Sequence, residues 1–409
     1  MPPRTGYVRW MNLRKVFNQL LVVGSLVACT SEPPAPVATP PTFIDPPVQG
    51  AALAPNWNVG NGNVLLTWLE NIADGHALYG AELDGDQWSN AEQIVQGNDF
   101  FANWADLPTT VENAEGKRFA HWLSKLGEDT YAYGVDLARQ EEDGTWEKIG
   151  LLHDDSSPTE HGFASYAPWP DGGLQAFWLD GRAMLDGGAM QLRTTSLHGA
   201  PSTSQILDDR ICECCSTDAA LTANGPVIVY RDRDANEVRD IAIIRATADG
   251  WSEPTLVHAD GWQIHGCPVN GPAVAADGER LAVAWFTAAT EPRVAVIFSD
   301  DGGATFGAPV LVDGEQPLGR VDLVLDDNGD ALVSWLGSHA TSPGAAEIRW
   351  RRITREGEAQ PVQMVAPTAA TRAAGVPRMV RRGRELLFAW VDVKEPPRVR
   401  AAIVNLSNP

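Results

Sequence analysis

Short apolar runs rich in β-branched and aromatic residues recur along the chain, and they predict β-strands rather than helices. Each run is bounded by Gly, Asp or Asn, and no stretch keeps a long 3.6-residue period of apolar positions. Seven of the runs place an aromatic residue at the same point, at intervals of 50 to 56 residues. This spacing indicates one structural unit repeated seven times. The seven aromatic residues are Trp68, Trp122, Trp178, Tyr230, Trp285, Trp335 and Trp390.

A second repeated feature is a turn followed by an aromatic residue, about 20 residues after most of these runs. Asp143-Gly144 before Trp146 and Asp249-Gly250 before Trp251 are two examples. The most complete copy runs from Ser299 to Phe306 and reads Ser-Asp-Asp-Gly-Gly-Ala-Thr-Phe. Asp-Gly supplies a tight hairpin turn, and we expect the aromatic residue to pack on the neighbouring sheet.

The repeats predict an all-β fold, a β-propeller of seven four-stranded blades. A unit of about 50 residues with four short strands cannot bury both faces alone, whereas radial stacking buries them. The last repeat, from about Gly375 to Asn408, has room for only three strands. We therefore expect the segment from Phe43 to Gly50 to supply the fourth strand and close the ring. A six-bladed propeller with one irregular repeat is the alternative.

The amino-terminal residues are typical of an export signal. A basic start is followed by an apolar run from Leu20 to Val27, too short to span a bilayer. Leu26-Val27-Ala28-Cys29 resembles the lipobox of bacterial lipoproteins, which implies a signal peptide over 1–28 and lipidation of Cys29. The Pro-rich stretch 29–48 predicts an extended tether before a propeller over 43–409. Thr30 after the lipidated cysteine favours anchoring in the outer membrane of the cell envelope.

Charge excludes several kinds of partner. The chain carries 31 Lys and Arg against 53 Asp and Glu, a formal net charge of -22. Without residues 1–28 the balance is 27 against 53, or -26. Such a chain repels nucleic acid and anionic lipid surfaces. We expect a monomer that touches the membrane only through its lipid anchor.

Three segments of repeats four and five should converge on one face. In a propeller, the loops that join consecutive blades emerge on the same face as the loops between the second and third strands. The lead-ins to repeats four and five carry Cys212, Cys214, Cys215 and Cys267, with His265 two residues before the last. In an exported protein four cysteines favour disulfides, with Cys267 linking the two loops. Three cysteines within four residues also suit a soft metal, Cu(I) or Zn(II), with Cys267 or His265 completing the shell, or a redox-active thiol pair.

The loop between these lead-ins is densely charged. From Arg231 to Asp240 it holds three Arg and four acidic residues, which can neutralise one another on the rim. Alternatively, Arg231, Arg233 and Arg239 grip an anionic group beside a carboxylate capable of acid–base work. The further candidates on this face are Trp104, Asp106, His161, Arg182 and Arg320.

The turn at Ser299 to Phe306 and the blade pattern resemble the Asp box and propeller of bacterial sialidase-like proteins with BNR repeats, from about Asn56 to Leu406. The chain is most similar to an exported subset with Cys-x-Cys-Cys, Tyr-Arg-Asp-Arg and Cys-Pro-Val-Asn-Gly-Pro motifs, here from Cys212, Tyr230 and Cys267. Sialidases use three Arg, a Tyr activated by a Glu, and an Asp. Carried over, the resemblance implies catalytic roles for Tyr230, Glu237 and Asp232. The early Arg-Ile-Pro segment of sialidases is missing, and the first Arg after residue 28 is Arg118.

We therefore expect an exported lipoprotein whose sialidase-like propeller binds a small-molecule, glycan or protein ligand, or a soft metal, through the loops of repeats four and five. An exo-acting glycoside hydrolase of sialidase type is one alternative. A protein-interaction scaffold that uses the broad loop face without chemistry is the other.

Overall fold

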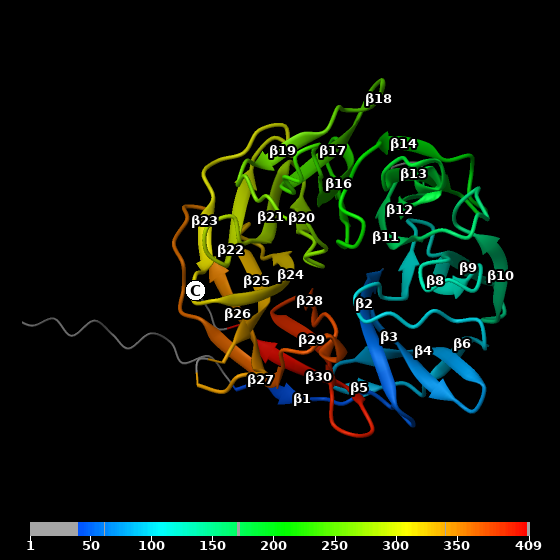
Figure 1. Cartoon of the computed structure of the whole chain (residues 1–409). Coiled ribbons are helices and arrows are strands. Elements are labelled where there is room, and N and C mark those ends of the chain that lie inside the picture. Colours follow the sequence, from blue (N-terminus) through cyan, green and yellow to red (C-terminus); the bar gives the residue numbers. More distant parts are fainter. Residues whose placement is uncertain (1–39, 61, 170–171, 340, 407–409) are drawn as a thin grey trace, which may run out of the picture. The chain divides into compact units, whose positions relative to one another are not determined.

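Seven antiparallel sheets lie in a ring in the computed structural model, which describes residues 40–406 except 61, 170–171 and 340 (Figure 1). Each sheet is one blade, and six of them take their strands from one repeat of the sequence, while blade seven adds β1 from the amino-terminal segment. The prediction of a seven-bladed all-β propeller is confirmed, and the six-bladed alternative is wrong. The predicted signal peptide and Cys29 lie outside the described residues.

The strands follow one another blade by blade. Blades one to three contain β2 (Ala52–Gly60), β3 (Asn63–Ile72), β4 (Gly75–Asp84), β5 (Gln87–Trp88) and β6 (Glu92–Gly97); β7 (Thr109–Glu112), β8 (Arg118–Lys125), β9 (Tyr133–Gln140) and β10 (Trp146–Leu151); β11 (His161–Pro168), β12 (Leu174–Asp180), β13 (Gln191–Leu197) and β14 (Gln205–Asp208). Blades four and five contain β15 (Asp218–Thr222), β16 (Gly225–Arg231), β17 (Ile241–Thr247), β18 (Gly250–Trp251) and β19 (Thr255–His258); β20 (Ala273–Asp277), β21 (Arg280–Thr287), β22 (Arg293–Ser299) and β23 (Val310–Asp313). Blades six and seven contain β24 (Pro317–Leu325), β25 (Ala331–Ser338), β26 (Ala345–Ile353) and β27 (Gln363–Ala369); β28 (Arg378–Arg382), β29 (Glu385–Asp392), β30 (Arg398–Asn405) and β1 (Thr42–Phe43).

Helical structure is limited to two short 3₁₀ turns in the described residues, η1 (Arg182–Asp186) and η2 (Arg372–Ala374). Within the same residues, no helix has the length and apolar character needed to cross a membrane.

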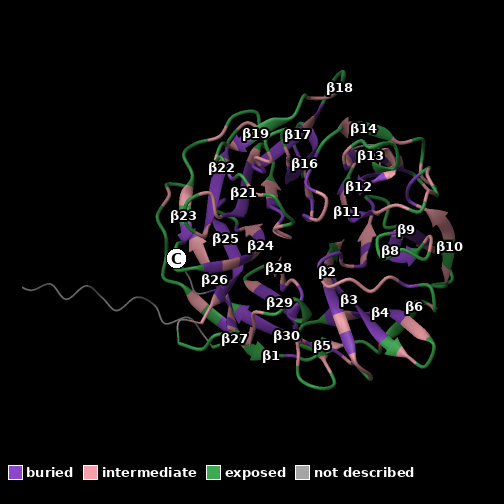
Figure 2. Ribbon diagram, viewed as in Figure 1, coloured by how far each residue is buried: buried purple, intermediate pink, exposed green. Residues whose placement is uncertain are grey.

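The repeated aromatic residues form the buried spine of each blade. They lie on the second strand, whose residues are mostly buried (Figure 2). In five blades the ring donates its N–H or O–H to a carboxylate, which satisfies the one polar atom of a buried ring. These pairs are Trp68 with Glu70 (2.8 Å), Trp178 with Asp180 (2.8 Å), Tyr230 with Asp208 (2.6 Å), Trp285 with Asp260 (2.6 Å) and Trp335 with Asp313 (2.6 Å).

The ring is joined by its first strand. β1 pairs with β30, with Thr42 opposite Ile403 and Phe43 opposite Ala402, and so completes the sheet of blade seven. Residues just after β1 continue the contact, because the N–H of Ile44 donates to Ala401 (3.0 Å) and Trp88 of blade one donates to the carbonyl of Ile44 (2.6 Å). Blades one and seven are thereby held together by one segment.

The first strand of each blade lines the axis. Three of these strands contain a bulge near the face that carries the loops between consecutive blades. Ala54, Phe163 and Arg320 have positive φ values of 54°, 53° and 54°, at register shifts in β2, β11 and β24. A bulge bends a strand and redirects its side chains. At Phe163 and Arg320 this backbone lies beside the site described next.

Candidate functional site

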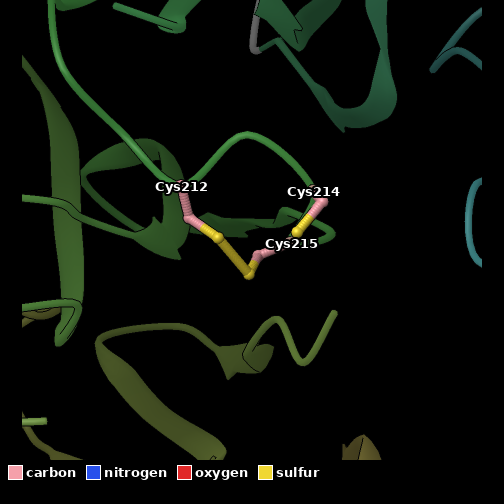
Figure 3. A group of neighbouring side chains, drawn as sticks. All are labelled: Cys212, Cys214 and Cys215. Carbon is pink, nitrogen blue, oxygen red and sulfur yellow. A yellow bond between two sulfur atoms is a disulfide. The ribbon is translucent and has the colours of Figure 1, made fainter. Parts of the chain in front are cut away.

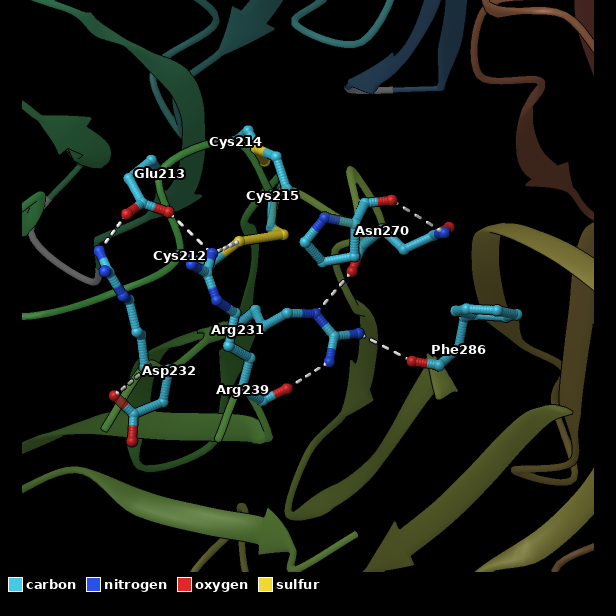
Figure 4. Close-up of a disulfide and its surroundings, with 12 residues drawn as sticks. Cys212, Glu213, Cys214, Cys215, Arg231, Asp232, Arg239, Asn270 and Phe286 are labelled. Carbon is cyan, nitrogen blue, oxygen red and sulfur yellow. Dashed lines mark hydrogen bonds and ion pairs between the residues drawn. A yellow bond between two sulfur atoms is a disulfide. The ribbon is translucent and has the colours of Figure 1, made fainter. Parts of the chain in front are cut away.

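The three loops of blades four and five meet on one face, as the sequence predicts. They are the loop 209–217 between β14 and β15, the loop 232–240 between β16 and β17, and the loop 259–272 between β19 and β20. Disulfides, ion pairs and hydrogen bonds connect all three (Figure 4). The face that carries them is called the loop face below.

The four cysteines of these loops form two disulfides. Cys212 pairs with Cys215 within one loop (Figure 3). Cys214 pairs with Cys267 across two loops. Of the three sequence interpretations, the structure contains the disulfide form, in which the sulfurs are not the thiolates that Cu(I) or Zn(II) binds. His265, the predicted additional metal ligand, is exposed on the loop that carries Cys267.

Arg231 holds the loops together and is not free for a ligand, so its predicted binding role is wrong. Only 1% of it is exposed. Its guanidinium donates to the carbonyls of Asn270 (2.9 Å), Arg239 (2.6 Å) and Phe286 (2.7 Å) (Figure 4). It also lies over the ring of Trp262. Burial lowers the pKa of Arg231 to about 9, which is still above neutral pH.

The remaining charges of the predicted site neutralise one another in a closed ring of four. Arg239 pairs with Glu213 (2.7 Å) and Glu237 (2.9 Å), while Arg233 pairs with Glu237 (2.6 Å) and Glu213. Hydrogen bonds from Arg233 and Arg239 lower the pKa of Glu237 to about 2. Glu237 is therefore ionised at neutral pH and has no proton to give, so the ring matches the self-neutralising interpretation.

Tyr230 and Asp232 do not form a catalytic pair. Tyr230 is fully buried in the spine of blade four, where it occupies the position of the repeated Trp and donates to Asp208. A nucleophile must touch substrate, so the predicted role of Tyr230 is wrong. Asp232 is half-buried and accepts the N–H of Arg233 (2.6 Å), and burial raises its pKa to about 6.

A cavity of about 820 Å³ opens on the loop face. One wall comes from blades four and five and includes Glu213, Arg239 and the Cys214–Cys267 disulfide. The opposite wall comes from blades two, three and seven and includes aromatic, acidic and apolar side chains. This second wall contains Asn103, Trp104, Asp129, Thr130, Tyr131, Pro158, Thr159, Glu160, Met184 and Arg372.

Glu160 is the most perturbed acid of this cavity. Burial raises its pKa to about 7, helped by the charge of Glu213 and opposed by a hydrogen bond from the hydroxyl of Tyr133 (2.5 Å). Tyr133 itself is 1% exposed and stacks on Phe101. The pKa of Tyr133 is raised by burial and by nearby acids, so its hydroxyl keeps its proton. Glu160 can thus hold a proton at neutral pH and release it into the cavity.

At one edge of the cavity, two arginine side chains lie against the ring of Trp104. The guanidinium of Arg320 lies 4.8 Å from the centre of its ring, and that of Arg372 lies 5.9 Å away. Arg320 is fixed by the carbonyls of Gly375 (2.6 Å) and Thr371 (3.2 Å). Arg372 has no carboxylate partner among the described residues. This edge differs from the ring of four charges because, within the described residues, neither of its two cations pairs with a carboxylate.

A smaller cavity of about 200 Å³ lies along the axis and shares Ala105 and Phe163 with the larger one. Its lining includes Asp106 and Asp218, whose pKa values burial raises to about 7. Asp106 accepts the N–H of Phe163 (2.7 Å), so this carboxyl joins blades two and three. Four lining residues carry a buried polar atom without a hydrogen-bond partner in the described part of the chain: Asn56, Trp57, Thr110 and Tyr166.

Two further predicted residues have structural partners. His161 is fully buried, stacks on His153 and bonds Asp155 (3.0 Å). Arg182 pairs with Asp154 (2.8 Å) and Asp180 (2.7 Å).

The residues that sequence reasoning missed are chiefly Glu160, Tyr131 and Arg372. Glu160 lies in the loop between blades two and three. It immediately precedes His161, a candidate site residue in the sequence analysis. Loops that join consecutive blades emerge on one face, and this holds for the loop of Glu160 as well as for those of blades four and five. The position of Glu160 in such a loop is the sequence signal that could have identified it.

Comparison with known proteins shows the fold. No protein-family model matches the chain, and no curated protein matches it. The structure is similar to a protein of unknown function from Dyadobacter fermentans, with 14% identity over 91% of this chain and 99% of that one and a TM-score of 0.52. It is also similar to the GH93 α-L-arabinofuranosidase of Fusarium graminearum, with 13% identity over 90% and 98% and a TM-score of 0.50. A sialidase, Hz136, matches with 16% identity over 70% and 63% and a TM-score of 0.44. The chain therefore shares its β-propeller fold with the first two of these structures.

Proposed function

We propose that this chain is an exported lipoprotein whose propeller binds a glycan in the 820 Å³ cavity of the loop face and hydrolyses a glycosidic bond there, with Glu160 as the proton donor. The observation that carries the proposal is the position of a protonatable carboxyl in the wall of a sugar-sized cavity. The fold shared with an arabinofuranosidase supports it.

The size and lining of the cavity suit a short glycan. Ligand cavities commonly measure about 300–1,000 Å³ and combine apolar walls with a few polar groups. Trp104 and Tyr131 offer aromatic faces on which the apolar face of a sugar ring can pack, and Tyr131 is 66% exposed. Asn103, Thr130 and Thr159 supply donors and acceptors for hydroxyl groups.

Glycoside hydrolysis needs two carboxyl groups with different protonation. Glu160 is suited to protonate the leaving oxygen. Asp129 lines the same cavity and can supply the second carboxylate. Glu213 is held in place by Arg233 and Arg239, whereas Asp129 is exposed.

Turnover of a panel of fluorogenic glycosides, including an arabinofuranoside and a sialoside, tests the proposal. We expect Glu160→Gln to lower kcat on the best substrate at least about 100-fold, because general acid catalysis contributes about 10²–10⁴-fold. Substrate binding should persist. The matched control is Glu128→Gln, an exposed acid next to Asp129 that does not line the cavity. No turnover or binding of any glycan in the panel, or full activity of Glu160→Gln, would contradict the proposal.

The envelope location rests on residues 20–29, with their apolar run and lipobox-like end. Metabolic labelling with a radioactive fatty acid tests it. We expect label on the wild-type chain in the outer-membrane fraction and none on Cys29→Ser. Unlabelled wild-type protein would contradict the proposal.

A further inference from the structure

The two disulfides share one compact cluster of sulfur atoms. The Sγ atoms of Cys212, Cys214 and Cys215 all lie within 4.8 Å of one another (Figure 3). Cys267 is bonded to Cys214. Thiol–disulfide exchange requires only that a thiolate reach a disulfide sulfur. In this cluster, a thiolate formed from one disulfide is already close to the other.

The two disulfides differ in access. Cys212 and Cys215 are each 1% exposed. Cys267 is exposed and Cys214 is half-buried, and both line the cavity of the loop face. A reductant from solution therefore meets the Cys214–Cys267 bond, called the outer disulfide, before the Cys212–Cys215 bond, called the inner disulfide.

The two disulfides also differ in how strongly the fold favours them. The outer disulfide links cysteines 53 positions apart and joins two loops, whereas the inner one spans three positions. Closing a longer loop restrains the unfolded chain more, so the outer bond gains more from folding. Nη1 of Arg239 lies 3.5 Å from Sγ of Cys212, where its charge stabilises a thiolate (Figure 4). The bond that a reductant reaches first is thus the bond whose loss destabilises the fold more.

We infer that this cluster is a dithiol–disulfide relay that takes two electrons from an external dithiol at the outer disulfide and stores them in the inner pair. The site is independent of the proposed glycan chemistry, because it needs neither Glu160 nor a sugar.

The first half of the relay is ordinary exchange. A thiolate of the external dithiol attacks Sγ of Cys267, the bond to Cys214 breaks, and Cys214 leaves as a thiolate. The second thiol of the reductant then attacks its own sulfur in the mixed disulfide and releases Cys267. The external dithiol is oxidised to a disulfide, and Cys214 and Cys267 have gained two electrons.

The second half moves the electrons inward. The Cys214 thiolate attacks Sγ of Cys215, and Cys212 leaves as a thiolate beside Arg239. The Cys267 thiolate attacks Sγ of Cys214, which forms the outer disulfide again and expels Cys215. The protons released by the external dithiol balance the two new thiols. The result is an intact outer disulfide over a reduced Cys212–Cys215 pair, and the reverse sequence reduces an external disulfide.

Limited reduction tests the destination of the electrons. The full chain is treated anaerobically with one equivalent of dithiothreitol, quenched in acid, alkylated under denaturing conditions and mapped by peptide mass spectrometry. We expect the label on Cys212 and Cys215. Label on Cys214 and Cys267 with an intact inner disulfide would overturn the relay.

Variants test the route. In Cys214→Ser/Cys267→Ser, we expect the inner disulfide to be reduced at least tenfold more slowly, because its internal nucleophile is missing. An equal or faster rate would mean direct attack and would overturn the relay. Arg239→Gln should slow inner reduction several-fold while the outer disulfide opens at the wild-type rate, which a merely structural role would not produce. The control Gln263→Ala, exposed on the loop of Cys267, should behave as wild type.

Discussion

The two walls of the loop-face cavity differ in what their charges do. On the wall from blades four and five, Arg239 pairs with Glu213 and Glu237. Behind this wall, Arg231 donates to backbone carbonyls and Arg233 pairs with the same two acids. On the opposite wall, Arg372 has no carboxylate partner among the described residues, and Glu160 holds a proton near neutral pH.

This difference shows that a dense cluster of opposite charges in a sequence indicates ion pairs within the protein more readily than a ligand-binding site. Oppositely charged side chains a few residues apart reach one another before they reach a ligand. Groups that remain free for chemistry are isolated in sequence, such as Glu160, and are brought to the cavity by the ring.

The largest expected effect is a loss of stability when the loops of blades four and five lose Arg231. Arg231→Met should lower the free energy of unfolding by about 3 kcal/mol or more, because three buried carbonyls lose their donor. Chemical denaturation measures it. Arg372→Gln, on the open wall, should change stability by less than about 0.5 kcal/mol. Equal losses in the two variants would refute the distinction between the walls.

The open wall should respond in binding instead. Trp104→Ala should weaken binding of the best glycoside about tenfold or more, about 1.4 kcal/mol, because an aromatic face is lost. Calorimetric titration measures it. Trp251→Ala, at the hairpin β18 outside this cavity, is the control and should bind normally.

Stability should depend on pH in a direction set by the buried acids. Burial raises the pKa values of Asp106, Glu160 and Asp218 to about 7. Between their ordinary values and about 7, the folded state binds more protons than the unfolded state, so stability falls as pH rises. We expect Tm to be about 2–5 °C higher at pH 5 than at pH 8. Asp106→Asn should reduce this difference, and a higher Tm at pH 8 would contradict the assignment.

The smallest effect couples the two walls. The charge of Glu213 contributes to the raised pKa of Glu160, so Glu213→Gln should lower that pKa. Activity requires protonated Glu160 and should fall above about pH 7 in the wild type. In the variant, this fall should begin at lower pH. The pH dependence of kcat/KM measures both, and an unchanged profile would show that the walls do not interact.

The fold could be predicted because the same sequence pattern recurs in every blade. The aromatic residue on the second strand recurs seven times, and its spacing determines the number of blades. The same evidence identifies Tyr230 as a core residue, since it stands where six blades have Trp. Its catalytic interpretation followed a family motif instead of its place in the repeat.

The cavity could be predicted only in part. Cys214, Cys267 and Arg239 line the cavity, and they could be predicted because their loops have an unusual composition. Trp104 and Arg372 are 268 positions apart and meet only because the ring closes. The raised pKa of Glu160 depends on burial by residues distant in sequence, which no local pattern records.

Ring closure also sets an order on synthesis. β1 is among the first parts of the propeller to be made, yet its partner β30 is the last. Until Arg398–Asn405 has been synthesised, the earliest strand has no sheet to join, and blade seven cannot form. A chain that stops before that point has neither β30 nor a partner for β1, so blade seven lacks two of its four strands.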